Sequence, residues 1–432
     1  MASTSGFAGL TSGLRRHKAA DSGPVRATAD DAAQCKASAV ERGYFKDPFI
    51  GCFVDRPRRR SPLIHRGYFV RVACLDRTVR AFVEAAGPSS QVVNLGGGVD
   101  STFWRLAATG CNPRKFVELD LPAVTRRKAR CIAAAPLLKA ALASSTGEEA
   151  TQVDHGEGNG VSVAAAAYAL CPCDIGDPAA VDAALTSAGI DRSLPTLFLS
   201  ECVLIYLRPE RSDGLLAWIS GAFPAAAVAI YEQILPHDAF GAVMVRNLAD
   251  RGLALRSFEA YPDCTAQAKR LLAAGFHRCT VANMLGAAEA LVPRPAMVAA
   301  ARAEPLDEVE EWSIMQSHYC LALAIKEPDA AGAELGGRGG GAAGRAPEEA
   351  GGRAGAASEA GVPAGEGQGR VVGRRGWAEG RRADAPAAGG VIAAAVLMRE
   401  EAMAGGSGGP GGAAGLVGGV VPAANPAAAS NE

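Results

Sequence analysis

The residues whose types and spacing could do chemistry are three consecutive glycines and the carboxylates that follow them along the chain. Gly96–Gly98 come directly after the apolar segment 92–95, and glycines there let a ligand lie against the backbone. Asp120, Asp174 and Glu201 each stand at the end of a later apolar segment. If these segments are parallel strands, their carboxylates surround the crevice in which open α/β sheets bind ligands. The pattern predicts a ligand that carries ribose hydroxyls and positive charge.

Two cofactor classes fit the glycines and Asp120. A nicotinamide dinucleotide is usually bound by G-x-G-x-x-G, but Ser101 stands at the position of the third glycine. Asp174 and Glu201 would also repel its pyrophosphate, whereas a sulfonium cation with an adenine amino group would not be repelled. The pattern therefore favours S-adenosylmethionine. It leaves open that any one of these carboxylates caps a helix instead, and for Asp174 the two roles can coexist.

Only a parallel sheet would bring these residues together. From Gln91 onward, short apolar runs alternate with helical segments, which is typical of a doubly wound α/β domain. Seven strands are predicted, at 92–95, 115–119, 168–171, 196–199, 227–231, near 277–282 and at 319–325. Helices are predicted at 102–108, 121–134, 181–188, 210–222, 266–274 and near 306–315. The result is a seven-stranded, mostly parallel sheet with helices on both faces.

Composition divides the chain into four parts, which are residues 1–29, 30–86, 87–328 and 329–432. The first is small and polar and the last is rich in Gly and Ala. Neither can bury enough side chain to offset its ordering entropy, so both are predicted to be disordered. The second part carries apolar residues at helical spacing and is predicted to form an N-terminal helical lid. The third part is the sheet domain.

Three other segments have a plain interpretation and a functional one. Residues 135–163 are rich in Ala, Ser and Gly and are predicted to be an exposed insertion. The loop with Arg56, Arg58, Arg59 and Arg60 is either a solvated connection or a contact to an acidic protein partner. Arginines beside glycines in the C-terminal part resemble RNA-binding segments. The single aromatic residue there, Trp377, does not amount to the aromatic interleaving that supports stacking, so a solvated tail is predicted.

Charge, hydropathy and cysteine content argue against a nucleic-acid-binding, membrane, secreted or zinc-binding protein. Lys and Arg number 44 against 45 for Asp and Glu, so the net field attracts neither nucleic acid nor an anionic membrane. No apolar stretch approaches the roughly 18 residues that a membrane span needs, and residues 1–37 show no secretory signal. The 11 cysteines are then expected to be reduced thiols. Cys171 and Cys173 lack zinc spacing, so no metal is predicted. A cytoplasmic protein is expected.

Three strings carry a specific resemblance to a known family. They are NLGGGVDSTFWRL at 94–106, LPTLFLSECVLIY at 194–206 and YEQ at 231–233. They resemble leucine carboxyl methyltransferases, and the likeness extends from about Cys35 to Cys320. It implies a Rossmann-like class I methyltransferase fold and S-adenosylmethionine as cofactor. It also implies esterification of the C-terminal leucine of the type 2A protein phosphatase catalytic subunit, which would regulate holoenzyme assembly.

The resemblance also implies residue roles. The family's cofactor contacts fall on Lys36, Arg71, Gly96, Asp120, Asp174, Ile175 and Glu201. Lys36 and Arg71 would then be cations for the methionine carboxylate of the cofactor, although without the resemblance both are interpreted as surface charges. Gly97 replaces an alanine that is usual in the family, and Ile175 replaces a common leucine.

No catalytic side chain is expected. A C-terminal carboxylate has a pKa of roughly 3.5, so the nucleophile is already ionised at neutral pH. Tyr206, Tyr231, Gln233 and Arg246 are candidate walls of an acceptor pocket. Tyr206 and Tyr231 can equally be core aromatics with a satisfied hydroxyl.

Three alternative functions are open. Related methyltransferases act on modified transfer RNA or another small carboxylate, but the near-zero net charge and the missing second domain argue against RNA. A nicotinamide-dependent oxidoreductase is disfavoured by Ser101. A non-catalytic partner that kept the fold can be excluded only by turnover. A monomeric enzyme acting on a protein substrate is the leading expectation.

Overall fold

The computed structural model describes residues 23–146, 152–153 and 161–328. The disorder predicted for residues 329–432, and for most of residues 1–29, therefore concerns segments outside the described residues. No helix in the described ranges is long and apolar enough to cross a membrane. All 11 cysteines fall within these ranges, and each is a free thiol.

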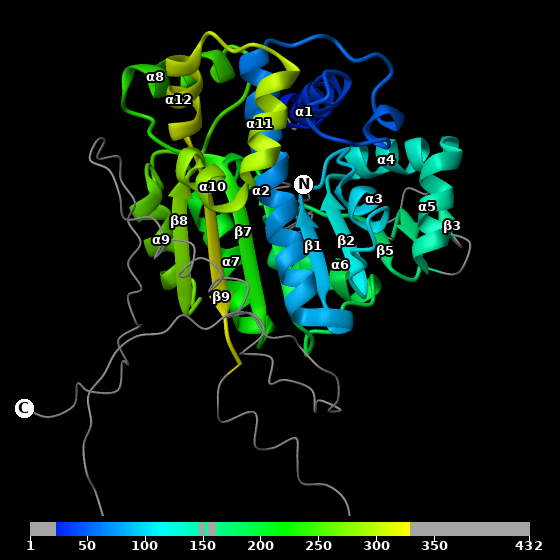
Figure 1. Ribbon diagram of the computed structural model, residues 1–432. Helices are drawn as coiled ribbons and strands as arrows, with labels where there is room; N and C mark the ends of the chain where they lie inside the picture. The colour runs from blue at the N-terminus through cyan, green and yellow to red at the C-terminus, as the bar shows by residue number, and fades with distance from the viewer. Residues whose placement is uncertain (1–22, 147–151, 154–160, 329–432) are drawn as a thin grey trace, which may run out of the picture. The chain divides into compact units, whose positions relative to one another are not determined.

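One sheet of nine strands forms within the described residues, in the order β3-β4-β5-β2-β1-β6-β7-β9-β8 (Figure 1). The strands are β1 (Gln91–Leu95), β2 (Lys115–Asp120), β3 (Gln152–Val153), β4 (Val163–Ala164), β5 (Tyr168–Pro172), β6 (Thr196–Glu201), β7 (Ala226–Gln233), β8 (Arg278–Asn283) and β9 (Tyr319–Lys326). Strands β5, β2, β1, β6 and β7 are parallel, and β9 is antiparallel to both of its neighbours. The predicted mostly parallel α/β sheet is confirmed.

The two strands that the sequence pattern missed, β3 and β4, extend the sheet beyond β5. Both begin within residues 135–163, so the prediction of an exposed insertion is wrong for part of this segment. Val163 is fully buried and pairs with Leu170, which covers the edge of β5 and its backbone hydrogen-bonding groups. Each strand has only two residues, which is too short for an alternating pattern to be recognised.

Twelve α-helices are present in the described residues. They are α1 (Gly23–Glu41), α2 (Pro62–Ala86), α3 (Thr102–Ala107), α4 (Pro122–Ala134), α5 (Pro136–Thr146), α6 (Pro178–Ser187), α7 (Pro209–Ala222), α8 (Ala239–Ala249), α9 (Cys264–Ala273), α10 (Met284–Leu291), α11 (Arg294–Ala303) and α12 (Val309–Ser317). Every helical segment predicted from the sequence overlaps one of them. The pattern missed α5, α8, α10 and α11, each of which contains at least three alanines.

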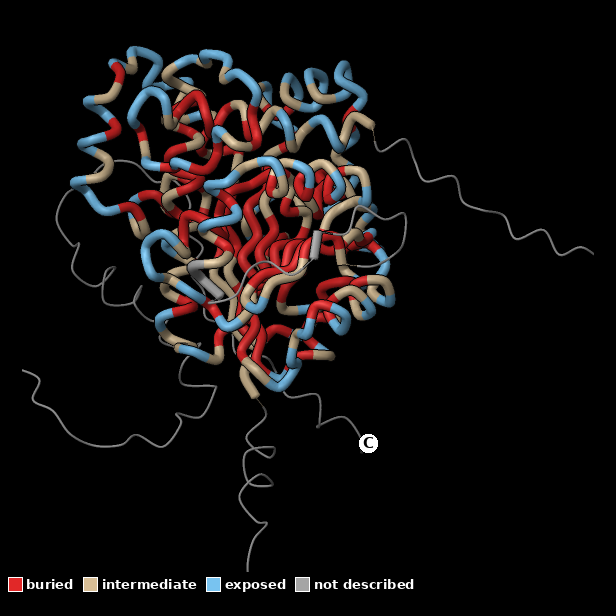
Figure 2. The backbone as a smooth tube through the Cα atoms, turned by 90° about the vertical axis from the view of Figure 1, so that its right-hand side faces the viewer, coloured by how far each residue is buried: buried red, intermediate tan, exposed pale blue. Residues whose placement is uncertain are grey.

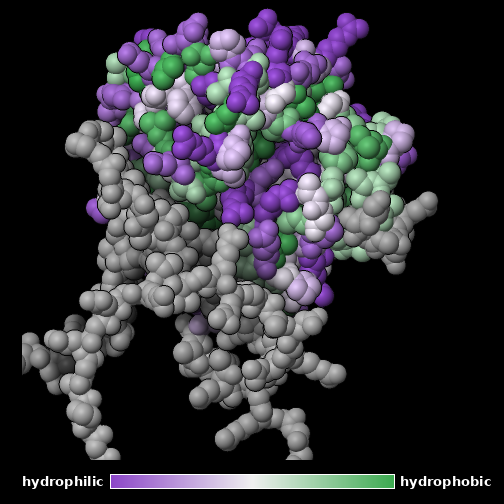
Figure 3. Space-filling view, in the orientation of Figure 1, coloured by the Kyte–Doolittle hydropathy of each residue, from purple (hydrophilic) through white to green (hydrophobic). Residues whose placement is uncertain are grey.

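Helices cover both faces of the sheet, as predicted. Val92 belongs to the core that packs under α2, α3 and α10, whereas Val93 belongs to the core under α6, α7 and α9. Adjacent residues of a strand point to opposite faces, so this alternation shows that β1 is buried on both sides. Figure 2 shows the buried residues concentrated in the sheet and on the inward sides of the helices. In Figure 3 the corner formed by α5 is mainly hydrophobic.

The N-terminal helix α1 corrects one boundary. It begins at Gly23, so residues 23–29, which were predicted to be disordered, are helical. Ala33 and Ala37 are buried in the core shared with α2, and their small side chains let the two helices approach closely. Residues 23–29 carry no large apolar side chain except Val25, so their composition gave no sign of a helix. In Figure 1, α1 (dark blue) lies across the upper end of the strands.

Candidate functional site

A cavity of about 280 Å³ lies where the carboxyl ends of the parallel strands meet α1. Parallel strands end at the same edge of a sheet, so residues far apart in sequence converge there. The lining contains every residue predicted to contact the cofactor, namely Lys36, Arg71, Gly96, Asp120, Asp174, Ile175 and Glu201. The first half of α1 also borders the cavity, so this helix occupies the position expected of a lid.

The turn after β1 requires glycine at position 96 but not at position 97. Gly96 has φ +69°, and a Cβ there would lie 2.6 Å from the methyl carbons of Val203. Gly97 has no positive φ, and a Cβ there would meet nothing closer than 3.2 Å, at Asn94 Nδ2. Alanine is therefore excluded at the first position and tolerable at the second, which agrees with the alanine usual there in the family that the sequence resembles.

Asp120 is anchored by the backbone and still has capacity to bind. Its Oδ2 accepts a hydrogen bond from Gly98 N at 2.7 Å, and its Oδ1 accepts one from Leu121 N at 2.6 Å. A carboxylate offers about four lone-pair sites, so acceptors remain for a ligand. Burial raises the pKa of Asp120 above its ordinary value. The N-cap of α4 is Leu121, so the helix-cap interpretation is wrong for Asp120.

Asp174 lies at the exposed rim of the cavity. Its Oδ1 accepts from Gly176 N at 3.1 Å, and its Oδ2 lies 2.9 Å from an Arg211 guanidinium nitrogen. The cap of α6 is Asp177, whose side chain accepts from Ala179 N at 3.0 Å. Asp174 is therefore not the cap of this helix. Its neighbour Ile175 is buried and forms an apolar part of the lining.

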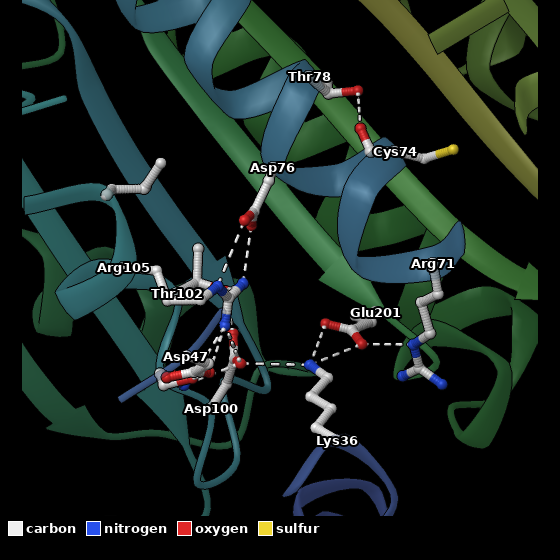
Figure 4. Close-up of polar contacts among 12 residues, drawn as sticks. Lys36, Asp47, Arg71, Cys74, Asp76, Thr78, Asp100, Thr102, Arg105 and Glu201 are labelled. Carbon is white, nitrogen blue, oxygen red and sulfur yellow. Dashed lines mark hydrogen bonds and ion pairs between the residues drawn. The ribbon is translucent and has the colours of Figure 1, made fainter. Parts of the chain in front are cut away.

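Lys36 and Arg71 converge on one carboxylate (Figure 4). Lys36 Nζ lies 2.9 Å from Glu201 Oε1 and 3.2 Å from Asp100 Oδ1, and Arg71 Nε donates to Glu201. The interpretation of Lys36 and Arg71 as surface charges is wrong, because they are 4 % and 8 % exposed. Burial opposes ionisation of Glu201, but Arg71 and Lys36 outweigh it and lower its pKa. The site thus contains both signs of charge, which suits an amino acid zwitterion.

Asp100 is a further residue of the site, to which no role was predicted from the sequence. It lines the cavity, and Arg105 lies 3.6 Å from its Oδ1. Lys128 Nζ donates to its carbonyl oxygen at 2.7 Å. Burial opposes ionisation, yet Lys36, Arg105 and Lys128 hold its pKa well below the ordinary value. Asp100 keeps Lys36 charged and directed into the cavity, and its position directly after the glycines was the available signal.

Two of the four residues predicted for the acceptor pocket lie at the cavity. Tyr206 and Gln233 line the cavity. Tyr231 and Arg246, although both lie in the described part of the chain, are not in the lining. The Tyr231 ring lies behind Arg71, 4.6 Å from its guanidinium carbon, and stacks on Tyr319 at 5.3 Å between ring centroids. Arg246 points to solvent from α8, so it is wrong as a pocket wall.

Several residues of the lining were missed. Tyr68 and Tyr319 border the cavity beside Arg71, and Tyr68 could have been found because it stands in the segment around Arg71. Arg251 follows α8 and borders the mouth, where it lies 3.3 Å from Asp31 of α1. This pair joins α1 to the segment after α8. It could not be predicted, because α8 itself was not recognised in the sequence.

Comparison with known proteins gives consistent likenesses. The family model described as leucine carboxyl methyltransferase matches residues 24–220. The leucine carboxyl methyltransferase 1 homolog of Arabidopsis thaliana is 39% identical over 305 residues, which are 70% of this chain and 89% of that protein. Leucine carboxyl methyltransferase 1 of Bos taurus is 36% identical over 313 residues, which are 72% of this chain and 91% of that protein. The tRNA wybutosine-synthesizing protein 4 of Homo sapiens is 37% identical over 311 residues, which are 70% of this chain but only 44% of that protein.

Proposed function

The chain belongs to the leucine carboxyl methyltransferase family, and from that premise we propose that its protein substrate is the type 2A protein phosphatase catalytic subunit. The enzyme is an S-adenosylmethionine-dependent methyltransferase that acts on a C-terminal leucine carboxylate. The observation that carries the proposal is the convergence of all predicted cofactor contacts in one cavity, beside a wall formed by Tyr206 and Gln233. We further propose that the enzyme is a cytoplasmic monomer and that methylation regulates phosphatase assembly.

The residues of the cavity fit S-adenosylmethionine. Asp120 has lone pairs for the ribose hydroxyls, and Asp174 with Ile175 offers an acceptor and an apolar wall for adenine. Glu201 can accept from the amino group of the methionine moiety, while Lys36 and Arg71 can bind its carboxylate. When bound, the cofactor supplies an electrophilic methyl group on its sulfonium.

The protein's own task is alignment. Good alignment of an ionised carboxylate with its target is worth about 7–11 kcal/mol. Cys202 borders the cavity, but burial raises its pKa to about 12, so it is a neutral thiol and a poor nucleophile at physiological pH. Burial also raises the pKa of Tyr206, so its hydroxyl stays protonated and can donate to a substrate oxygen. No general base is needed, because the substrate carboxylate is already ionised.

Gly96→Ala is expected to weaken binding of S-adenosylhomocysteine by about tenfold or more. A non-glycine residue at positive φ costs on the order of 1–3 kcal/mol, and Val203 would have to move away from the new methyl group. Isothermal titration calorimetry measures the change. Gly97→Ala is the matched control and should bind within about threefold of the wild type. Equal affinities for the two variants would contradict the requirement for glycine at position 96.

Methyl transfer to the phosphatase tests the proposed substrate. Labelled methyl from S-adenosylmethionine should appear on the catalytic subunit and should be released by mild alkali, because the product is an ester. A subunit that lacks its terminal leucine should take up no label. Arg246→Ala should transfer at the wild-type rate, since Arg246 lies outside the cavity lining within the described chain. Alkali-stable label, or label on the truncated subunit, would reject the proposal.

A transfer RNA substrate is the competing proposal, because the chain is 37% identical to tRNA wybutosine-synthesizing protein 4 of Homo sapiens. The chain spans only 44% of that protein, and its net charge of −1 offers no general attraction for RNA. A modified transfer RNA fraction should therefore take up no label in the same assay. Label in the RNA, with none on the phosphatase, would reverse the two proposals.

A further inference from the structure

The loop Cys202–Leu207, between β6 and α7, borders both the part of the cavity that contains the cofactor residues and the part that contains the acceptor wall. Cys202, Val203, Tyr206 and Leu207 all belong to the lining. Val203 covers the glycine turn, since its methyl carbons lie 2.6 Å from the position of a Cβ on Gly96. Tyr206 forms part of the acceptor wall. A displacement of this loop would therefore disturb cofactor binding and acceptor binding together.

The loop begins in a conformation that needs support. Cys202 has φ +56°, in the left-handed region that residues other than glycine rarely adopt. Such a residue costs on the order of 1–3 kcal/mol and persists only when its surroundings hold it. Cys202 N donates to Tyr231 O at 2.7 Å, and Ser257 N donates to Ile205 O at 3.1 Å. Ser257 Oγ also donates to Leu207 O at 2.7 Å.

Glu232 holds the middle of the loop from outside the cavity. Its side chain is fully buried on β7, and its Oε1 accepts a hydrogen bond from Ile205 N at 2.7 Å. Its Oε2 accepts no hydrogen bond of ordinary geometry from the described residues, although the Gln267 side chain and the Leu204 backbone also lower the pKa of the carboxyl group. The nearest cation is Arg270, with Nη1 at 3.8 Å. A buried carboxylate so weakly paired is costly, and an apolar side chain of similar volume would often be more stable. The contact with the loop is what this carboxylate provides.

We propose that Glu232 is a positioning residue, which fixes the loop Cys202–Leu207 and thereby sets both the glycine turn and the acceptor wall without touching either ligand. The acceptor half of this inference rests on the proposed function. The cofactor half does not depend on which protein is methylated.

Glu232→Ala is expected to weaken S-adenosylhomocysteine binding about tenfold and to raise the KM for the phosphatase catalytic subunit about tenfold, because Ile205 N loses a charged acceptor. Glu232→Gln keeps an oxygen acceptor and should change both by no more than about threefold. Asp213→Asn is the matched control. It weakens the outer partner of Arg270, whose Nε lies 2.9 Å from Asp213 Oδ1, and leaves the loop contact intact. Calorimetry, initial rates and thermal unfolding are measured on all three.

The pH dependence provides a second readout. Burial raises the pKa of Glu232 to about 7. The groups that face it are Arg270 from α9, Cys202 from the loop and Cys320 from β9. Burial holds the pKa of both thiols far above neutrality, so neither titrates in this range. Wild-type affinity should therefore fall toward that of Glu232→Gln below about pH 7, while the Gln variant shows no such change.

Each outcome decides for or against the inference. Wild-type affinity and KM in Glu232→Ala would overturn it, as would a Glu232→Gln protein that is as impaired as the alanine variant. If the alanine variant does not fold, the pH comparison decides, and coincident profiles for wild type and Glu232→Gln would overturn it. Wild-type enzyme that binds the cofactor product but transfers nothing to the phosphatase would reject the substrate proposal, and the calorimetric comparison would still test Glu232.

Discussion

Asp120→Ala is expected to weaken S-adenosylhomocysteine binding by on the order of 100-fold. A hydrogen bond to a charged acceptor contributes about 1.5–3 kcal/mol, and the carboxylate would accept from two ribose hydroxyls. The substitution also removes the acceptor of Gly98 N, at 2.7 Å, and of Leu121 N, at 2.6 Å, so the glycine turn loses a restraint. Isothermal titration calorimetry on the folded variant measures the loss.

Asp177→Ala is the matched control for this prediction. Asp177 also follows a parallel strand, but its side chain caps α6 through Ala179 N at 3.0 Å. Its removal should cost about 1 kcal/mol of stability and leave the affinity unchanged. If Asp120→Ala bound within about threefold of the wild type, the ribose role would be excluded and Asp120 would serve only to order the turn.

The convergence of the predicted cofactor residues in one cavity has a topological reason. Asp120 and Glu201 both end parallel strands, and β1 separates β2 from β6, so their convergence follows from the strand order. Lys36 and Arg71 came from the resemblance alone, because helical spacing gives no sign that a cation is buried. Glu201 pairs with both cations, and the second partner of Lys36, Asp100, was visible in the glycine string. Its role depended on Lys36 approaching from α1, and the sequence does not specify that approach.

Fewer of the predicted acceptor residues line the cavity, because that part of the cavity is built from loops and helix ends. Arg246 was predicted to line the acceptor pocket, yet α8 turns it to solvent, and Arg251 lies at the cavity mouth instead. Periodicity cannot choose between two arginines when the helix that carries them is not recognised. Tyr231 illustrates a second difficulty. Tyr231 and Glu232 are adjacent on β7, so their side chains point to opposite faces of the sheet. Only the contacts with Tyr319 and Arg71 show that the Tyr231 ring lies behind Arg71.

The fold was predictable wherever strands are buried on both faces. The apolar runs of β1, β2, β5, β6 and β7 are continuous, and each predicted strand lies within the observed one or matches it closely. Edge elements gave no such signal. Strands β3 and β4 are too short, and α10 and α11 carry alanine where amphipathic helices usually carry larger residues. These elements form because the core already exists for them to pack on.

Lys36→Met is expected to lower the free energy of unfolding by about 3 kcal/mol and to weaken cofactor binding, because it leaves Asp100 and Glu201 as close, buried carboxylates. Lys36 Nζ lies 3.2 Å from Asp100 Oδ1 and 2.9 Å from Glu201 Oε1, and methionine nearly preserves the side-chain volume. Urea unfolding measures the loss. Arg192→Met removes a partner from the exposed ion pair with Asp182 and should cost under about 1 kcal/mol.

The pH dependence of this loss separates charge from packing. In the wild type the pKa values of Asp100 and Glu201 lie below their ordinary values, so their stabilising contribution is present near neutral pH and is lost only in acid. Without Lys36, only Arg71 at Glu201, and Arg105 and Lys128 at Asp100, still oppose the effect of burial. Both pKa values are therefore expected to rise from their wild-type levels, and one carboxylate is expected to take up a proton as the pH falls. The deficit of Lys36→Met should therefore be larger at about pH 8 than at about pH 5. A deficit that is the same at both pH values would mean that Lys36 stabilises by packing, and its role as a cation of the cofactor site would then rest on the affinity measurement alone.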